Sequence, residues 1–291
     1  DGHADREYLA AYTDFPADLE AHLAARGPAW AAAVTGLTVA EIETFARLYN
    51  TTRRSYIRVG YGFTRSRNGP AAMHAVTCLP AVTGAWRHEG GGALWSNRVL
   101  YHWDKTMIEG LDALDPDTRE LDMCRIGAVL TGDPAALKGG PPVTAMLVQN
   151  TNPAVVAPET NRVLTGLARE DLFLVVHEQF LTDTAAYADI LLPATMFLEH
   201  DDLYQAGGHT HFQIGPRLID PPGECRSNHE VVQALARRLG AAHPGFEMTA
   251  MELIDWTLRA SRWPDAARVL EDRWVDAGRP FEETHFLNGF G

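Results

Sequence analysis

The feature that most constrains this fold is a set of three short apolar runs separated by segments of helical pattern. The runs cover residues 145–148, 172–176 and 189–192. Because they do not alternate between apolar and polar residues, they are typical of parallel strands buried on both faces. Helices are expected at 161–168 and, more briefly, at 183–187, so a βαβαβ unit fits into about fifty residues. The sequence therefore predicts an α/β fold with an open, mostly parallel sheet and flanking helices.

The segments around this unit are mostly helical in pattern. Apolar residues at helical spacing predict helices over 6–12, 17–26, 39–49, 119–130, 251–260 and 263–274. Two capping boxes, Thr38 with Glu41 and Ser227 with Glu230, mark the starts of two helices. After Glu199, closely spaced glycines, prolines and histidines indicate irregular or short-stranded structure up to the second of these helices.

The balance of charge argues against two classes of partner. The 291 residues include 25 Lys+Arg and 38 Asp+Glu, which gives a formal net charge of -13. Nucleic acids and anionic membranes are bound by cationic surfaces, so general binding to either is not expected. The longest uncharged stretch, 139–158, contains prolines and asparagines that do not suit a membrane span. A soluble protein of about two domains, without a direct membrane span, is predicted.

Cysteine usage bears on metal sites and on the compartment. Cys78, Cys124 and Cys225 lie far apart and form no C-x-x-C, so they predict buried free thiols rather than disulfides or a cysteine-based metal site. Low cysteine use suits the cytoplasm. The sequence begins at Asp1 rather than Met, so an export signal upstream, and with it a periplasmic location, stays open.

A local cationic segment is the clearest anomaly in this acidic chain. Between Glu43 and Glu89 there is no acidic residue, but there are seven arginines: Arg47, Arg53, Arg54, Arg58, Arg65, Arg67 and Arg87. Two of them lie in a glycine-rich loop, 60–69, that follows a predicted strand at 55–59 and precedes a helix started by Pro70. Backbone N–H groups, the helix end and guanidinium groups there favour a phosphate or pyrophosphate. A tight turn with solvated arginines explains the pattern equally well.

Polar residues also follow two of the predicted parallel strands. Asn152 follows the first strand, and His177 with Glu178 ends the second. In open α/β sheets the carboxyl ends of the strands border the ligand crevice. Asn152 is suited to a phosphate or ribose, and Glu178 to a ribose hydroxyl or the donor edge of a guanine. An Asx turn at Asn152 and helix capping by His177 and Glu178 are the simpler alternatives.

A third cluster has the residue types of a metal site. Its members are Glu199, His200, Asp201, Asp202, His209 and His211. Carboxylates and imidazoles bind divalent metals, but H-E-x-x-H is absent and the side chains of adjacent residues diverge. A polar loop is the favoured interpretation. No G-x-S-x-G motif supports a serine hydrolase.

The run Thr182–Ala194, followed by Glu199 and His200, strongly resembles a signature of the molybdopterin oxidoreductases of the dimethyl-sulfoxide-reductase type. That family reads T-x-T-A-x-x-A-D, three hydrophobic residues, Pro, and Ala or Ser, and then a glutamate. Further blocks follow in the family's order: Arg58–Gly62 with Asn68 and Gly69, Leu79–Gly84 with Gly90–Gly92, Asn150–Pro153, and Arg226–Asn228. The blocks extend over roughly residues 1–245, and their combination is specific although no single block is.

The resemblance implies a cofactor of molybdenum, or of tungsten, held by two pterins that each extend through a pyrophosphate to guanosine (bis-molybdopterin guanine dinucleotide). In the family, the positions that hold these guanine dinucleotides match Gly60, Gly62, Phe63, Asn152, Pro153, His177, Glu178, Ala194 and Asn228. Many relatives have Ser at the position of Ala194, so only a backbone contact would remain there. No residue of this chain matches the family's metal ligand, and no catalytic residue is assigned.

By the same analogy the chain is an internal segment of a catalytic subunit, incomplete as a fold. Residues 1–58 would finish one α/β domain and be mainly helical, 59–197 would form the α/β domain that binds the pterin dinucleotide, and 198–291 would be an irregular or short-stranded segment followed by helices. Family members commonly add an upstream part, which supplies the metal ligand and often a 4Fe-4S cluster, and a downstream β-barrel domain.

The function that the resemblance implies is two-electron redox chemistry or oxygen-atom transfer on a small molecule, with an iron–sulfur electron-transfer subunit as partner. The segment by itself is expected to be inactive. One alternative is a non-catalytic electron-transfer scaffold that has lost its pterin, which the arginine-rich loop disfavours. A weaker alternative is a metal-dependent hydrolase built on the cluster around His200.

Overall fold

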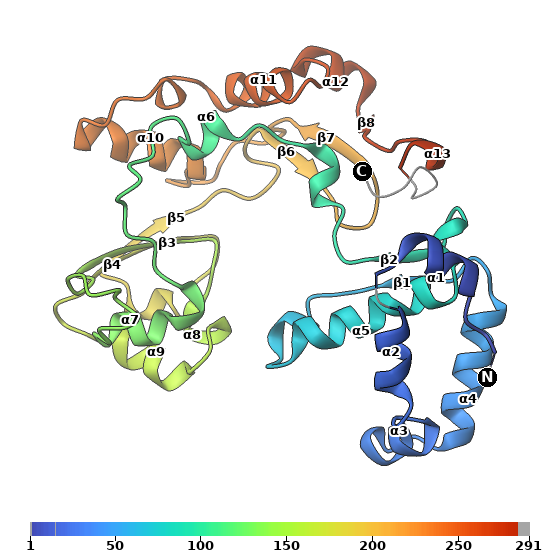
Figure 1. Ribbon diagram of the computed structural model, residues 1–291. Helices are drawn as coiled ribbons and strands as arrows, with labels where there is room; N and C mark the ends of the chain where they lie inside the picture. Colours follow the sequence, from blue (N-terminus) through green and yellow to red (C-terminus); the bar gives the residue numbers. More distant parts are fainter. Residues whose placement is uncertain (1, 15, 285–291) are drawn as a thin grey trace. The chain divides into compact units, whose positions relative to one another are not determined.

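A computed structural model describes residues 2–14 and 16–284 (Figure 1). The chain separates into two compact units. The first unit contains the described residues up to Leu100 together with Gly207–His209 and those from Ala277 onward, and the second contains Tyr101–Ala206 and Thr210–Asp276. The domain boundaries expected at residues 58 and 197 stay a prediction.

The first unit consists of helices and one small parallel pair of strands. Its helices are α1 (Arg6–Tyr12), α2 (Pro16–Leu23), α3 (Pro28–Thr35), α4 (Val39–Thr51), α5 (Gly69–Val82) and α13 (Phe281–Thr284), with short 3-10 turns η1 (Phe63–Arg65), η2 (Ala85–Arg87) and η3 (Arg98–Tyr101), the last of which ends in the second unit. β1 (Tyr56–Arg58) pairs in parallel with β2 (Gly92–Leu94). The capping box predicted at Thr38 is confirmed, because its side chain accepts from Glu41 N–H and Glu41 reaches back.

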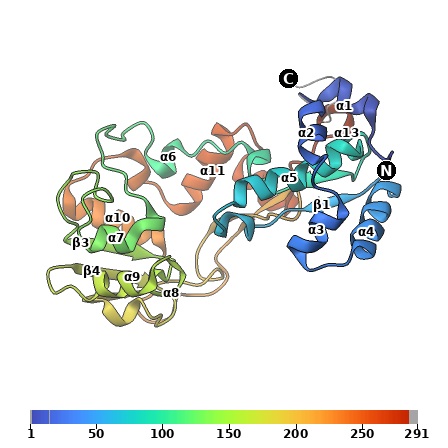
Figure 2. The ribbon, with the colours of Figure 1, turned by 60° about the horizontal axis from the view of Figure 1, so that its bottom comes forward.

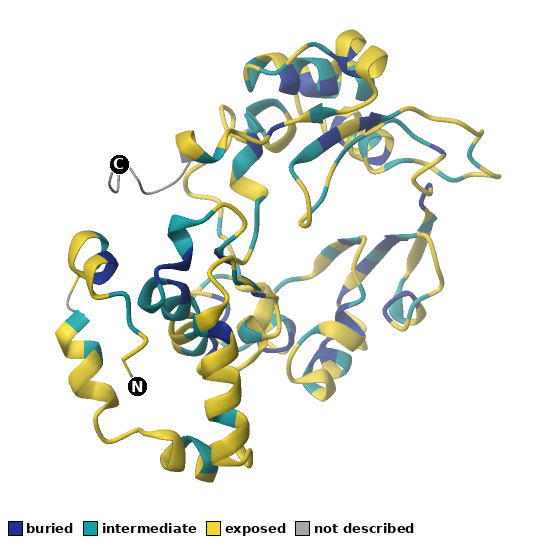
Figure 3. Cartoon of the chain, turned by 90° about the vertical axis from the view of Figure 1, so that its right-hand side faces the viewer, coloured by how far each residue is buried: buried dark blue, intermediate teal, exposed yellow. Residues whose placement is uncertain are grey.

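Much of the helical surface of the first unit is apolar and uncovered. Trp30 and Val34 on α3 are 49% and 66% exposed, and Phe45 and Leu48 on α4 are 57% and 65% exposed. Figure 3 shows the helices near the N-terminus mostly in the exposed colour. The first unit thus does not cover its own apolar helix faces, which a complete domain would bury.

The second unit contains the predicted βαβαβ arrangement. Strands β3 (Ala145–Gln149), β4 (Phe173–Glu178) and β5 (Ile190–Pro193) are parallel, in the order β3-β4-β5. Between them lie α8 (Pro153–Val156), α9 (Thr160–Leu167) and the 3-10 turn η5 (Ala185–Tyr187). The fold class predicted from the three apolar runs is confirmed.

One face of this sheet packs on helices. Val148, Leu174 and Val176 form a core with Val163 and Leu167 of α9. The helix α7 (Ile126–Leu130) lies beside α9 (Figures 1 and 2). Burial of this apolar face holds the strands in register and fixes which residues emerge at their carboxyl ends.

The rest of the second unit is a small antiparallel sheet and a helical layer. β6 (Asp202–Gln205), β7 (His211–Gly215) and β8 (Val275–Asp276) form the sheet in that order. The helical elements are α6 (Thr106–Glu109), the 3-10 turns η4 (Met123–Arg125) and η6 (Pro244–Phe246), α10 (Asn228–Leu239), α11 (Ala250–Ala260) and α12 (Ala266–Asp272). The capping box at Ser227 is confirmed.

Three predicted helices were too long. The helix expected over 17–26 ends at Leu23. The helix expected from residue 119 begins only at Ile126, because Arg119 instead donates to the carbonyls of Leu137 and Pro141 and Asp122 caps a 3-10 turn. The helix expected over 263–274 covers only Ala266–Asp272, since the side chain of Asp265 caps its start. Local periodicity identified all three segments but not their ends.

The structure also bears on membrane crossing and on the cysteines. Among the described helices, none is both long and apolar enough to cross a bilayer. All three cysteines are free, but the prediction of buried thiols was wrong for Cys124, which is exposed, while Cys78 and Cys225 are half-buried. Cys124 lies in a short 3-10 turn rather than inside a long helix, which explains its exposure.

Candidate functional site

The second unit contains a cavity of about 640 Å³ at the carboxyl ends of its parallel strands, here called the strand-end cavity. Its polar wall includes Asn150, Glu178, Gln179, Thr195, His200 and Asn228, and its apolar wall includes Met107, Ile108, Phe246, Leu253 and Ile254. Among the described residues, three carboxylates line it, from Glu178, Asp201 and Asp202, but no Lys or Arg does. Its chemistry therefore favours a ligand that donates hydrogen bonds over an anion.

The chain that follows β5 brings the two walls together. Arg226 donates from its backbone N–H to Pro193 (3.0 Å) and accepts from the N–H of Thr195 (3.2 Å). Ala194 thereby forms a parallel bridge with Arg226. Since α10 starts two residues later, its first turn lies at the same edge as the end of β4.

Glu178 and Asn228, two of the residues predicted to bind a ligand, line the strand-end cavity from opposite parts of the sequence. One carboxylate oxygen of Glu178 accepts from the N–H of Gln179 (2.7 Å). Within the described residues, its other oxygen and the Asn228 side-chain amide have no hydrogen-bond partner. Both groups are therefore available to a ligand.

His177 has a different position from its neighbour Glu178. Its side chain is fully buried, with Nδ1 3.2 Å from the Gln149 side-chain nitrogen and Nε2 3.0 Å from the carbonyl oxygen of Arg226. Both ring nitrogens are thus engaged inside the protein. His177 ties β4 to the segment that precedes α10 and does not line the strand-end cavity.

Asn152, Pro153 and Ala194 likewise belong to the frame behind the cavity. The Asn152 side-chain oxygen accepts from the N–H (3.1 Å) and the hydroxyl (2.7 Å) of Thr184, which is itself fully buried. Pro153 is the first residue of α8 and is buried. Ala194 donates its N–H to the carbonyl of Glu178 (3.1 Å). Asn152, His177 and Ala194 are called the strand-end frame below; their predicted contacts with a ligand stay predictions.

The other predicted ligand residues lie in the first unit. Gly60 and Gly62 are exposed, and Phe63, the first residue of η1, is half-buried. A Cβ added at Gly60 or Gly62 would meet nothing within 4 Å, so packing within the described structure does not require glycine there. Arg65 and Arg67 are exposed in the same loop.

Arg58 proves to be structural rather than free. Its guanidinium group donates to the carbonyls of Val59 (2.8 Å), Leu94 (3.2 Å) and Gly207 (3.1 Å). It therefore fastens the end of β1 to β2 and to the returning segment. Only part of the arginine cluster is left to face an anion.

The proposed metal cluster does not assemble. Within residues 2–14 and 16–284, no group of three His, Cys, Asp or Glu side chains is placed to hold a metal ion. Asp201 instead accepts from the N–H of Arg217 (2.8 Å), and His200 contacts the hydroxyl of Thr195. This favours the polar-loop interpretation.

Sequence reasoning missed Gln179, Thr195 and Asn150 as cavity residues. Gln179 and Thr195 directly follow Glu178 and Ala194, so their place after a strand end was the available signal. Asn150 has a positive φ of 55°, a conformation that asparagine tolerates in turns, so its residue type was the available signal. Tyr204 also lines the cavity; burial raises the pKa of its hydroxyl, which donates to the carbonyl of Phe197 (3.3 Å).

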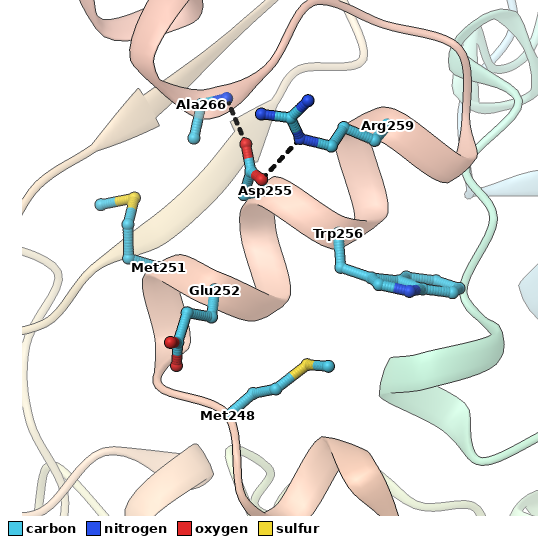
Figure 4. Close-up of a pocket in the computed structure, with 7 residues that line it drawn as sticks. All are labelled: Met248, Met251, Glu252, Asp255, Trp256, Arg259 and Ala266. Atoms are coloured by element: carbon cyan, nitrogen blue, oxygen red, sulfur yellow. Dashed lines mark hydrogen bonds and ion pairs between the residues drawn. The ribbon is translucent and has the colours of Figure 1, made fainter.

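A second hollow, of about 500 Å³, lies along α11 (Figure 4). Its main polar groups are occupied, because Asp255 accepts from Arg259 Nε (2.7 Å) and from the N–H of Ala266 (2.8 Å). Glu252 closes the capping box of α11 with Thr249. These contacts stabilise the helix, so the strand-end cavity is the better candidate site.

Comparison with known proteins gives a consistent family. Residues 18–238 match the family model described as molybdopterin oxidoreductase. A probable oxidoreductase, YoaE of Bacillus subtilis, is 40% identical over 237 residues, which cover 81% of this chain and 34% of that protein. Trimethylamine-N-oxide reductase 1 of Escherichia coli is 26% identical over 72% of this chain and 27% of its own length.

A solved structure shares the fold. Acetylene hydratase from Pelobacter acetylenicus superposes with a TM-score of 0.74 at 19% identity, covering 96% of this chain and 42% of that one. The chain spans about a third of the length of the curated relatives that it matches.

Proposed function

Since the chain belongs to the molybdopterin oxidoreductase family, as its motifs predicted, we propose that it is the part of the catalytic subunit that holds guanine-dinucleotide tails of the pterin cofactor. The observation that carries this proposal is the convergence of Glu178 and Asn228, 50 positions apart in the sequence, on one cavity with free polar groups.

The hydrogen-bonding groups of the cavity fit a guanine better than a phosphate. Guanine presents N–H donors on one edge, which suit the free carboxylate oxygen of Glu178. Within the described part of the chain, three carboxylates and no Lys or Arg line the cavity, so an anionic pyrophosphate would be repelled there. Taken by itself, the exposed loop of the first unit suits an anion such as a pyrophosphate, because it carries Arg65, Arg67 and two glycines that packing does not require.

When bound, the molybdenum or tungsten centre supplies two-electron redox chemistry or oxygen-atom transfer. This chain contributes binding and orientation: Glu178 and Asn228 hold the base, while the strand-end frame fixes where they stand. We further propose a small-molecule substrate, an iron–sulfur electron-transfer subunit, a 4Fe-4S cluster bound by another part of the polypeptide, and a cytoplasmic location.

The experiment compares the full-length protein with this chain alone. Metal analysis should find molybdenum or tungsten in the full-length protein, and acid hydrolysis should release GMP from it, whereas the isolated chain should retain little of either. Glu178→Gln in the full-length protein should lower the GMP released per protein. Glu224→Gln, which changes an exposed carboxylate outside the cavity, is the matched control.

The outcome separates the proposal from the scaffold alternative. A folded full-length protein that contains neither metal nor pterin would contradict the proposed enzyme and support a non-catalytic scaffold. Metal and pterin without GMP would retain the family chemistry but overturn the guanine-dinucleotide form of the cofactor. A metal-dependent hydrolase needs a cluster of three metal ligands, which the described residues do not form.

A further inference from the structure

We propose that His200, held in place by Thr195, is a specificity-determining residue that donates a hydrogen bond from Nε2 to O6 of the base in the strand-end cavity and so selects guanine over adenine. This inference rests on the proposed function and deepens it. It assigns a role to a residue that neither the metal-cluster interpretation nor the family motif explained.

The imidazole of His200 is held by a buried partner. Its Nδ1 lies 2.7 Å from Thr195 Oγ1, and Thr195 is only 3% exposed. The backbone of Thr195 is fixed on both sides, since its N–H donates to Arg226 (3.2 Å) and its carbonyl accepts from the Gln179 side chain (2.8 Å). The ring therefore has a defined orientation along the cavity wall.

The surroundings favour a proton on Nε2. The carboxylate of Asp202 lies 3.9 Å from Nε2, which is too far for a hydrogen bond but close enough to favour N–H at that nitrogen. Nδ1 then accepts from the Thr195 hydroxyl. Since Nδ1 is engaged with a buried residue, Nε2–H is the ring donor left for a ligand.

Three other side-chain donors along this wall are already used. The Gln179 amide donates to Thr195, and the Tyr204 hydroxyl donates to Phe197. His229 Nε2 lies 2.8 Å from the carbonyl of Met248. His200 differs from the free amides of Asn150 and Asn228 because a buried partner fixes its orientation.

The donor of His200 complements the acceptor of Glu178. Guanine carries N–H groups at positions 1 and 2 and an oxygen at position 6, whereas adenine carries an amino group at position 6. A wall with an acceptor at Glu178 and a donor at His200 matches the first pattern and opposes the second. The two residues share one frame, since Ala194, next to Thr195, donates to the carbonyl of Glu178 (3.1 Å).

The test uses the full-length protein prepared without cofactor and calorimetric titration with GDP, IDP and ADP. The wild-type protein should prefer GDP to ADP. His200→Leu should weaken GDP and IDP by about tenfold each, the value of one hydrogen bond, and should not weaken ADP, because the donor that opposes the adenine amino group is removed. His200→Gln, which restores an N–H at a similar reach, should recover most of the loss. Thr195→Val, which only releases the ring, should weaken GDP by about threefold.

The controls separate this inference from folding and from the proposed function. His22→Leu removes an exposed imidazole of the first unit, outside the cavity lining, and should change no titration. Unfolding temperatures without nucleotide check that each variant is folded. Glu178→Gln should weaken GDP more than IDP, because IDP lacks the amino group at position 2.

If Glu178→Gln weakens GDP while His200→Leu leaves the GDP-to-ADP ratio at the wild-type value, the role of His200 is overturned and the proposed function stands. If the wild-type protein binds no GDP and releases no GMP on hydrolysis, both are overturned. An equal loss of GDP and ADP affinity in His200→Leu would also refute base selection.

Discussion

The loop after β1 and the carboxyl ends of β3–β5 both contain candidate ligand residues, but the two regions differ in how these residues contact the rest of the protein. At Gly62 in the first unit, a Cβ added to the glycine would meet no atom within 4 Å, so packing within the described residues does not require glycine there. At the strand ends, by contrast, Glu178 keeps one carboxylate oxygen free, while both ring nitrogens of its neighbour His177 are held by hydrogen bonds.

This difference shows that a binding motif combines two kinds of residue. Some face the ligand and contribute little to folding, and others hold the frame and contribute to binding only through position. In the first unit the two kinds are separated along the loop, as Gly62 and Gly69 show. In the second unit they alternate along a strand, because successive side chains point to opposite faces.

The largest effect is expected from Gly69→Ala. A Cβ at Gly69 would lie 1.7 Å from the carbonyl oxygen of Phe63, so the backbone must shift, at a cost of about 3 kcal/mol. Gly62→Ala meets no atom and should change stability by less than about 0.5 kcal/mol. Urea unfolding of the full-length protein without cofactor measures both.

The GMP content of the holoprotein tests the role of Gly62, which the stability measurement does not. Gly62→Ala should lower the GMP recovered from the holoprotein while leaving the fold unchanged. Equal stability of the two variants would refute the division of the loop into a frame glycine and a ligand-facing glycine.

The next effect is expected at neighbouring residues of β4. His177→Leu removes, at a fully buried position, the ring that is bonded to Gln149 and to the carbonyl of Arg226, which should cost about 2 kcal/mol. Glu178→Gln keeps the shape of a half-buried side chain and should leave the free energy of unfolding almost unchanged. If Glu178→Gln destabilised the protein as much as His177→Leu, Glu178 would belong to the frame.

The βαβαβ unit was predictable because its signals are local. Each apolar run supplies its own strand, and the two residues of each capping box, at Thr38 and at Ser227, lie within four positions of each other in sequence. The strand β2 was missed, because three residues that start at Gly92 become a strand only by pairing with β1, far away in the chain. The helix α3 was missed for want of a polar face in PAWAAAVT.

The sequence predicted where the candidate site lies, but not the role of each residue in it. The strand ends identified Glu178 correctly as a cavity residue. The role of Asn152 is set by Thr184, 32 positions later, because the hydroxyl and the N–H of Thr184 both donate to the side-chain oxygen of Asn152. Such long-range pairings are set by packing, which one sequence does not display.

Substitution of Asn152 should lower the free energy of unfolding by less than substitution of His177. Asn152→Ala leaves the Thr184 N–H without its acceptor in the core, and we expect a loss of about 1.5 kcal/mol in the free energy of unfolding. Asn161→Ala is the matched control, since that exposed side chain on α9 makes no hydrogen bond within the described structure. Equal stability of the two variants would mean that Asn152 is held for a ligand rather than for the frame.

The smallest expected effect is a loss of stability in acid, and it can be compared between one helix of each unit. Hydrogen bonds from the backbone and the hydroxyl of Thr249 lower the pKa of Glu252, on α11, and those from the hydroxyl and the backbone of Thr38 lower the pKa of Glu41, on α4. Because each folded pKa lies below the unfolded value of about 4.3, the stabilisation is present above that pH and is lost as the pH falls through the folded pKa. Urea unfolding between about pH 3 and pH 7 should show wild type approaching Glu252→Gln only at the acid end.

Only one of these two helices borders the strand-end cavity, so the paired variants also test whether the capping contact reaches the site. Leu253 and Ile254 of α11 line the cavity, whereas α4 belongs to the other unit. Fraying of α11 in acid should therefore weaken GDP binding in the wild-type protein, and Glu252→Gln should shift that pH dependence while Glu41→Gln should not. An identical shift in both variants would mean that acid acts on the protein as a whole, not through the wall of the cavity.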